Sequence, residues 1–135
     1  GKFPQIEGFK GSLHNLAHGW NKPEGAVKLG EWDRFMAEQL SYFLDRLESA
    51  KEEHGSGLDN SIVLYGSSNS QTHNNTNYPL VLAGGNQIGL QHGQFLKYSS
   101  DVPMSNLFVT LLNCLGVASD SFADSNSLLT EMLAS

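Results

Sequence analysis

The stretch that decides the fold is Gly57–Ser68, which reads GLDNSIVLYGSS. After a turn-forming start it contains a short, unbroken apolar run, Ile62–Tyr65. Such a run is typical of a strand covered on both faces, as in a parallel sheet. A second run of the same kind, YPLVLAGG at residues 78–85, ends at a pair of glycines. We therefore expect two buried strands, at 62–65 and at 80–82.

Two amphipathic helices are expected on either side of these strands. The segment 31–53 carries apolar residues at helical spacing and should end at Gly55 and Gly57. Its expected core stripe is Trp32, Phe35, Met36, Leu40, Phe43, Leu44 and Leu47. The segment 101–117 should form the other helix, with Asp101 near its cap, Pro103 in its first turn and Gly116 at its end. Its expected core face is Met104, Leu107, Phe108, Leu111, Leu112 and Leu115.

The remaining segments give weaker signals. Residues 1–23 read as loop, 89–100 as a short hairpin or an edge strand, and 125–135 as one last short helix. The order helix, strand, loop, strand, helix predicts an α/β layered sandwich, with a small, mostly parallel sheet flanked by helices. The 135 residues suit a single domain, 1–135.

Composition excludes several classes of protein. The net charge of −6 argues against nonspecific binding to nucleic acid, which depends on clustered Lys and Arg. No apolar run approaches the roughly 20 residues that a membrane helix needs. Cys114 is the only cysteine, so no internal disulfide can form, and its apolar surroundings predict a small buried side chain. The chain begins at Gly1, which resembles a tag remnant, so we expect a piece of a longer protein.

Histidines provide the candidate site. His14 and His18 are four residues apart, a spacing that puts both imidazoles on one face of a helix. His73 lies in the polar loop after the first strand, and His92 follows the second strand. At the carboxyl edge of a parallel sheet, where ligands bind, these loops would meet. Three neutral imidazoles, from His14, His18 and His73, could hold zinc or another divalent metal ion, with His92 further out.

Alternatives to a metal site stay open. The same histidines could be ordinary exposed loop residues, and His54 should cap the end of the long helix. Ser67, Ser68 and Ser70 lack the G-x-S-x-G sequence of a nucleophile elbow, and the glycine pair 84–85 lacks the spacing of a phosphate loop. No paired carboxylates are apparent, since Asp59 precedes a strand and Asp101 is assigned to a cap.

Several ordered motifs together resemble a known family. They include HNLAHG, LDNSIVLYGS, YPLVLAGG and P-x-x-N-L-x-x-T-L-L, and the resemblance extends from about Gly11 to Asp124. The chain resembles the C-terminal part of an uncharacterised bacterial family catalogued as domain of unknown function 1552. That family is similar to the alkaline phosphatase and sulfatase superfamily. The resemblance implies an exported protein, an α/β sandwich with a mostly parallel sheet, and metal ions on Asp and His side chains.

The resemblance also implies roles for single residues. HNLAH falls where the superfamily has a D-x-x-x-H pair, so His14 and His18 would be metal ligands, with His14 in place of the usual Asp. His73 falls near the superfamily's late metal-binding His. Gly66 and Ser67 fall where an acidic pair would hold a second metal, and they offer no ligand. The superfamily's nucleophile comes earlier in the chain than any residue of this sequence, so this chain alone should be inactive.

Two functions follow as expectations. The first is the C-terminal segment of a metal-dependent hydrolase acting on phosphate or sulfate esters, including those of polysaccharides. The second is a noncatalytic module whose Asn- and Ser-rich loop binds a carbohydrate or a partner protein, with a decayed metal site. A C-terminal piece cut from a larger sheet would expose an apolar edge or face, so we also expect self-association or marginal stability.

Overall fold

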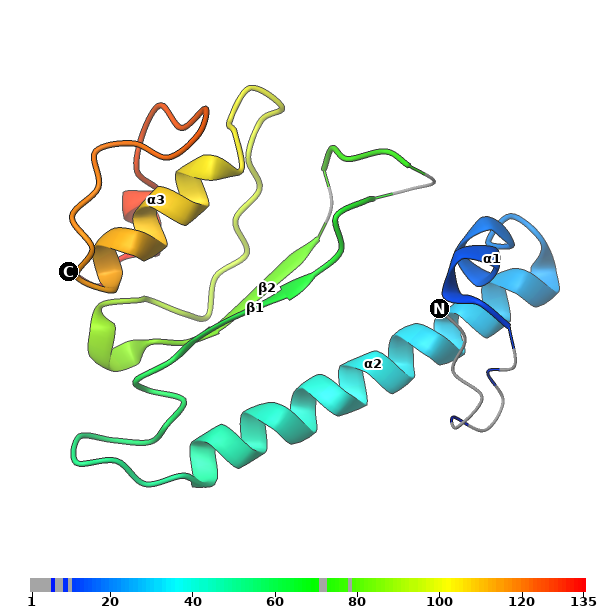
Figure 1. The fold of residues 1–135 in the computed structure, drawn as a ribbon, viewed down its shortest axis with the longest axis horizontal. Helices are drawn as coiled ribbons and strands as arrows, with labels where there is room; N and C mark the ends of the chain where they lie inside the picture. The colour runs from blue at the N-terminus through cyan, green and yellow to red at the C-terminus, as the bar shows by residue number, and fades with distance from the viewer. Residues whose placement is uncertain (1–5, 7–8, 10, 71–72, 78) are drawn as a thin grey trace.

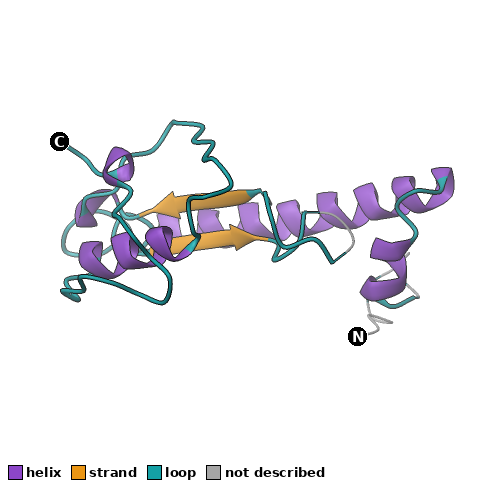
Figure 2. Ribbon diagram, turned by 90° about the horizontal axis from the view of Figure 1, so that it is seen from above, coloured by secondary structure: helices purple, strands orange, loops and turns teal. Residues whose placement is uncertain are grey.

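A computed structural model describes residue 6, residue 9 and the ranges 11–70, 73–77 and 79–135. In chain order the helices and strands are α1 (Leu13–His18), α2 (Pro23–Ser49), β1 (Ile62–Gly66), β2 (Leu80–Gly84), the 3-10 turn η1 (Asn86–Ile88), α3 (Ser105–Cys114) and the 3-10 turn η2 (Thr130–Met132). The sheet lies between α3 on one side and α2 on the other (Figures 1 and 2). Among the described residues, no helix is long and apolar enough to cross a membrane.

Both predicted strands are present, but the predicted mostly parallel sheet is wrong. β1 pairs with β2 in antiparallel register, with Ile62 opposite Gly84 and Gly66 opposite Leu80. A parallel pair needs a crossover, usually a helix, to carry the chain back to the starting end of the sheet. The connection from Gly66 to Leu80 contains no helix among its described residues, so the chain turns directly back. The result is a small α/β arrangement around a two-stranded sheet.

The long helix differs from its prediction in position and burial. It begins at Pro23, in the first helical turn where proline is favoured, and ends at Ser49, well before Gly55. His54 therefore lies beyond the last turn, and Arg46 is the basic residue near the C-terminus. Of the predicted core stripe only Trp32 is buried, and Phe43 is half-exposed. Trp32 packs edge-on against Phe9, with ring centroids 5.1 Å apart.

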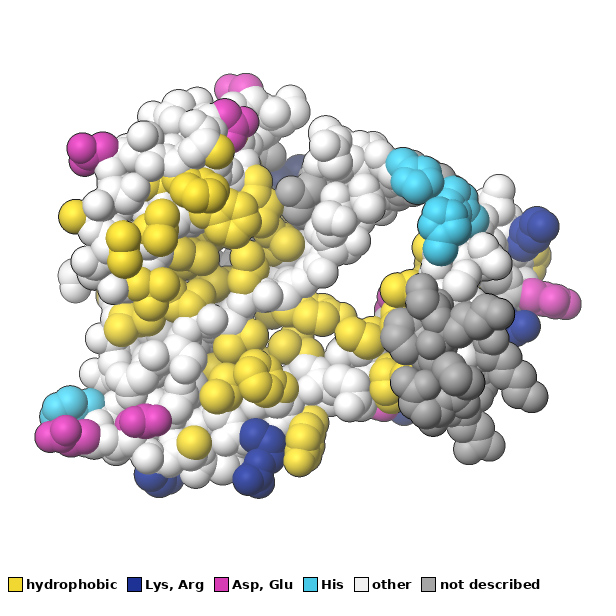
Figure 3. Space-filling view, in the orientation of Figure 1, with side chains coloured by type: hydrophobic (Ala, Val, Ile, Leu, Met, Phe, Trp, Pro, Cys, Tyr) yellow, Lys and Arg dark blue, Asp and Glu magenta, His cyan; other side chains and the backbone are white. Residues whose placement is uncertain are grey.

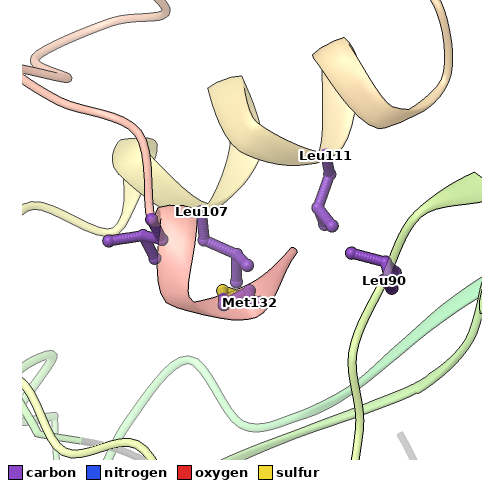
Figure 4. Packing of buried hydrophobic residues seen from close by; sticks show 5 residues of the cluster. Leu90, Leu107, Leu111 and Met132 are labelled. Carbon is purple, nitrogen blue, oxygen red and sulfur yellow. The ribbon is translucent and has the colours of Figure 1, made fainter. Parts of the chain in front are cut away.

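The apolar core gathers around α3 instead. It consists of Leu90, Leu107, Leu111, Leu129 and Met132 (Figure 4). β1 and β2 contribute partly buried side chains such as Leu64 and Leu82, and Cys114, predicted to be buried, packs there partly buried. Burial raises the pKa of the Cys114 thiol, which suits a packing role. Phe108 and Leu115, predicted on the core face of α3, are exposed.

A polar network fixes the loop that covers α3. The Asn106 side chain donates to Asn126 Oδ1 and Ser127 Oγ, both at 2.9 Å, and its oxygen accepts from the backbone N–H of Asn126. Thr110 Oγ1 accepts from the backbone N–H of Leu129 at 2.8 Å. Asn106 and Thr110 are each 1 % exposed. The Asn and Thr of the P-x-x-N-L-x-x-T-L-L motif thus hold a loop in place.

The C-terminal segment pairs with the chain that follows β2. Gln91 N–H donates to Met132 O at 2.8 Å, and Ala134 N–H donates to Gly89 O at 2.9 Å. Residues 89–91 were predicted as part of a hairpin or an edge strand, and here they form only an isolated bridge between Leu90 and Leu133. The predicted last helix is a single 3-10 turn, η2.

Polar contacts also tie the end of α2 to the strands. Buried Ser56 has its hydroxyl 2.9 Å from both Glu48 Oε2 and Asp59 Oδ2. Asp59 Oδ1 accepts from the Asn86 side chain at 3.0 Å. Asp59 precedes β1 and Asn86 follows β2, and both positions lie at the end of the sheet away from the loop after β1. The Asp59 carboxylate therefore links the start of β1 to the end of β2. Asp101, in contrast, does not cap α3, which has no side-chain cap.

Candidate functional site: a cluster of three histidines

The short helix α1 places the first two histidines side by side. Ser12 caps it, because its Oγ accepts from the backbone N–H of Asn15 at 3.2 Å. The helix extends from Leu13 to His18, within a region predicted as loop. Because residues four apart lie on one face of a helix, the rings of His14 and His18 are neighbours, with centroids 4.5 Å apart.

A close approach of two glycines sets the position of α1 on α2. A Cβ added to Gly25, in the first turn of α2, would lie 1.9 Å from the carbonyl oxygen of Gly19. Gly19 is the C-cap residue of α1, and its carbonyl also accepts from Lys22 N–H at 3.0 Å. Only glycine permits this contact without moving α1. Gly25 was not among the predicted site residues, although a glycine inside a long amphipathic helix is a signal of close packing.

The third histidine comes from the loop after β1. His73 adopts a positive φ of 55°, which turns the chain where the loop reaches α1. Its ring centroid lies 5.1 Å from that of His18 and 6.0 Å from that of His14. The three rings therefore meet although His73 is 55 residues from His18. Figure 3 shows histidine side chains gathered on the surface where this loop meets the N-terminal region.

The closest atoms in the cluster are two ring nitrogens. His73 Nε2 and His18 Nε2 are 3.2 Å apart, and as neutral rings one can donate a hydrogen bond to the other. Two nitrogens bound to one tetrahedral zinc, each at about 2.0–2.1 Å, would be about 3.3 Å apart. The pair thus matches both a hydrogen bond and one edge of a metal site. All three histidines are exposed, so a ligand or an ion can reach them from solvent.

The cluster is not a fully formed metal site. Within the part of the chain that the structure describes, no group of three or more His, Cys, Asp or Glu side chains has the arrangement of one. The His18 and His73 nitrogens already have a suitable separation. His14 contributes a third imidazole, whose ring centroid lies 4.5 Å from that of His18 and 6.0 Å from that of His73.

The other two histidines lie elsewhere. The antiparallel sheet sends the loop after β1 and the loop after β2 to opposite ends, so the expectation that both meet at one edge is wrong. His92 instead hydrogen-bonds the carbonyl of Gly84, at the end of β2. His54 lies in the turn after α2, where its carbonyl accepts from the Asn60 side chain at 2.6 Å. Neither ring joins the cluster.

The loop between β1 and β2 consists mostly of polar residues. All described residues from Gly66 to Asn77 are exposed. Asn74 organises part of it, because its side-chain oxygen accepts from both the N–H and the hydroxyl of Thr76, at 3.1 and 2.8 Å. Ser70 N–H donates to Asn74 O at 2.8 Å. These contacts hold the segment next to His73.

Comparisons of this chain with known protein families, with curated proteins and with solved structures found no match.

Proposed function

We propose that His14, His18 and His73 bind a divalent transition metal ion, with zinc the first choice. The observation that carries this proposal is the 3.2 Å separation of the His18 and His73 Nε2 atoms, with the ring centroid of a third imidazole, His14, 4.5 Å from that of His18. Imidazole nitrogen is a preferred ligand of zinc and of similar borderline ions. Three protein ligands are also the usual number in catalytic zinc sites, where a fourth position stays open for water or substrate.

We further propose that the metal serves the hydrolysis of phosphate or sulfate esters in a longer, exported protein that contains this chain. This part of the proposal draws on the resemblance of the histidine motifs to the phosphatase and sulfatase superfamily. It draws nothing from the fold, because the antiparallel sheet is not that of the superfamily. A bound metal would act there as a Lewis acid on an ester oxygen or would lower the pKa of a bound water. His18 and His73 would hold the ion, and the polar loop would face the substrate.

A noncatalytic binding module is the second candidate function. The observation that favours it is the exposed, Asn- and Ser-rich loop after β1, in which side chains such as Ser67 and Asn69 face solvent. Such amide and hydroxyl groups suit hydrogen bonds to a carbohydrate or to a partner protein. This function needs no metal, so metal binding separates the two candidates.

The test is a measurement of bound metal. Elemental mass spectrometry of the purified chain, before any contact with a chelator, should give close to one zinc or other transition metal ion per chain. The double variant His14→Ala, His73→Ala should lose the metal and the thermal shift on adding zinc. His54→Ala, which removes an exposed histidine outside the cluster, should keep both. Absence of metal from the wild type, together with no thermal shift, would overturn the proposal and favour the binding module.

A further inference from the structure

The two-stranded sheet has unprotected edges. β1 and β2, with sequences IVLYG and LVLAG, contain no charged residue and no proline. Natural edge strands are commonly protected against pairing by Lys, by Pro, by bulges or by a covering segment. Among the described residues, no third strand pairs with either one. Apart from the Gly84 carbonyl, which accepts a hydrogen bond from His92, the outer edges of β1 and β2 therefore carry unpaired backbone groups on apolar strands.

The burial of these strands does not match their sequence. An unbroken apolar run is typical of a strand that is covered on both faces. Ile62, Val63, Leu64 and Tyr65 are nevertheless only half-buried. β2 is more open still, because Leu80 is 36 % and Val81 is 49 % exposed. Two strands alone are also fewer than the three or more that usually give a sheet independent stability.

The total exposed surface is large for a chain of this mass. The accessible area is 9528 Å². A compact monomer of 14.7 kDa has about 6,900 Å². The excess is roughly 2,600 Å² over the whole chain, and the exposed side chains of Leu80 and Val81 in β2 contribute to it. Apolar side chains account for part of it, and Figure 3 shows them gathered over the sheet and α3.

We propose that this chain forms a dimer in which β2 of one copy pairs with β2 of a second copy, so that the two sheets join into one of four strands. A second copy of the chain can pair with this edge, because a strand paired antiparallel with the same strand of another copy is related to it by a two-fold axis. Such a contact closes after two chains. Since β1 and β2 carry no charge, the net charge of −6 places no like charges directly at the paired edge. In the dimer, cross-strand neighbours cover part of the exposed Leu80 and Val81 side chains.

The experiment combines molar mass with a matched pair of variants. Light scattering or sedimentation at physiological salt should give twice 14.7 kDa for the wild type. Val81→Lys puts a charge on the paired strand, twice per dimer, and should raise the dissociation constant at least about tenfold. Val27→Lys makes the same substitution at a 63 % exposed position of α2 and should leave the dimer intact. A monomeric wild type, open-ended assemblies, or equal effects of both variants would overturn the proposal.

Hydrogen exchange gives a second readout that needs no variant. If β2 pairs with its copy, amides in residues 80–84 of the wild type should exchange more slowly at concentrations above the dissociation constant than below it. Amides in the solvent-exposed part of α2 should show no such dependence. Protection of β2 that does not change with concentration would contradict the dimer, even where Val81→Lys fails to fold.

Discussion

The two main helices of this chain hold very different shares of the folded structure. α3 has ten residues, six of them buried, whereas α2 has 27 residues and buries only Trp32. Their amphipathic patterns are both clear in the sequence. The difference comes from their neighbours, because α3 is enclosed by β1, β2, residues 124–129 and η2, while α2 is covered mainly at its N-terminal part by α1 and Phe9. An amphipathic stripe thus indicates which face of a helix could be buried. Whether that face is buried depends on which other segments of the chain pack against it.

The largest difference between the helices should appear on removing an apolar side chain from each. Leu111→Ala, in the α3 core, should lower the free energy of unfolding by about 3 kcal/mol, since it removes a buried side chain and leaves a cavity. Phe43→Ala, at a half-exposed position of α2, should cost less than about 1 kcal/mol. Urea unfolding followed by circular dichroism measures both. Equal losses would show that α2 is covered as thoroughly as α3, as it would be if the dimer interface extended over it.

A second difference concerns polar contacts. Asn106→Ala should cost about 2 kcal/mol, because it leaves the backbone N–H groups of Asn126 and Ser127 without their acceptor in a partly buried place. The control is Asn113→Ala in the exposed last turn of the same helix. That exposed side chain donates to the Val109 and Ser119 carbonyls, the second of these bonds lies at the surface, and the loss should stay below about 1 kcal/mol. Thermal unfolding of both variants compares them, and a larger loss for Asn113→Ala would contradict the role given to Asn106.

The fold was partly predictable from the sequence. Both strands, the presence but not the bounds of the two main helices, and the Gly116 turn followed from local apolar runs, helical periodicity and glycine, which act within a few residues. Strand direction did not follow, because it depends on the path of residues 67–79, a polar segment with no apolar pattern. The assumption that continuous apolar strands are parallel therefore led to the wrong sheet. The predicted burial of α2 was wrong for a related reason. The spacing of apolar residues in a helix does not show whether other segments pack against that face.

The candidate site shows the same division. The contact between His14 and His18 follows from a spacing of four once the segment is helical, and the structure confirms that helix. The approach of His73 was predicted from a parallel sheet that does not exist, although the ring does lie beside His18. His92 was placed by the same assumption and lies at the other end of the sheet, on Gly84. Only a loop that returns to α1 could reach the histidine pair.

Alanine substitutions at two glycines of α2, Gly25 and Gly30, test how the N-terminal part of this helix is packed. Gly25→Ala adds a Cβ where the Gly19 carbonyl lies, so α1 must move, and stability should fall by about 1–2 kcal/mol. Gly30→Ala meets no atom within 4 Å and should raise stability by about 0.5–1 kcal/mol through helix propensity.

The same two variants test the histidine cluster. Because α1 carries His14 and His18, Gly25→Ala should also weaken zinc binding in calorimetry, while Gly30→Ala should not. If both variants bind zinc as the wild type does, the position of α1 on α2 does not control the cluster.

The smallest expected effect is a pH dependence at the junction of α2 with the strands. The backbone N–H of Ser56, and then the Asn86 and Ser56 side chains, hold the pKa of Asp59 below its ordinary value of 3.8. The folded state therefore favours the carboxylate. Its contribution to stability is complete above the ordinary pKa and is lost as the pH falls through the lowered value of the folded chain.

Melting temperatures measured between about pH 5 and pH 3 should consequently fall more steeply for the wild type than for Asp59→Asn, which has no carboxyl proton to gain. Asp45→Asn removes one negative charge from an exposed position of α2 and should follow the wild-type curve. If Asp45→Asn flattened the curve as much as Asp59→Asn, the acid sensitivity would reflect total charge. A flat curve for Asp59→Asn alone would instead show that the acid sensitivity arises at the Asp59 carboxylate, which bonds both Ser56 and Asn86. That carboxylate belongs to the contact that holds α2 to the sheet.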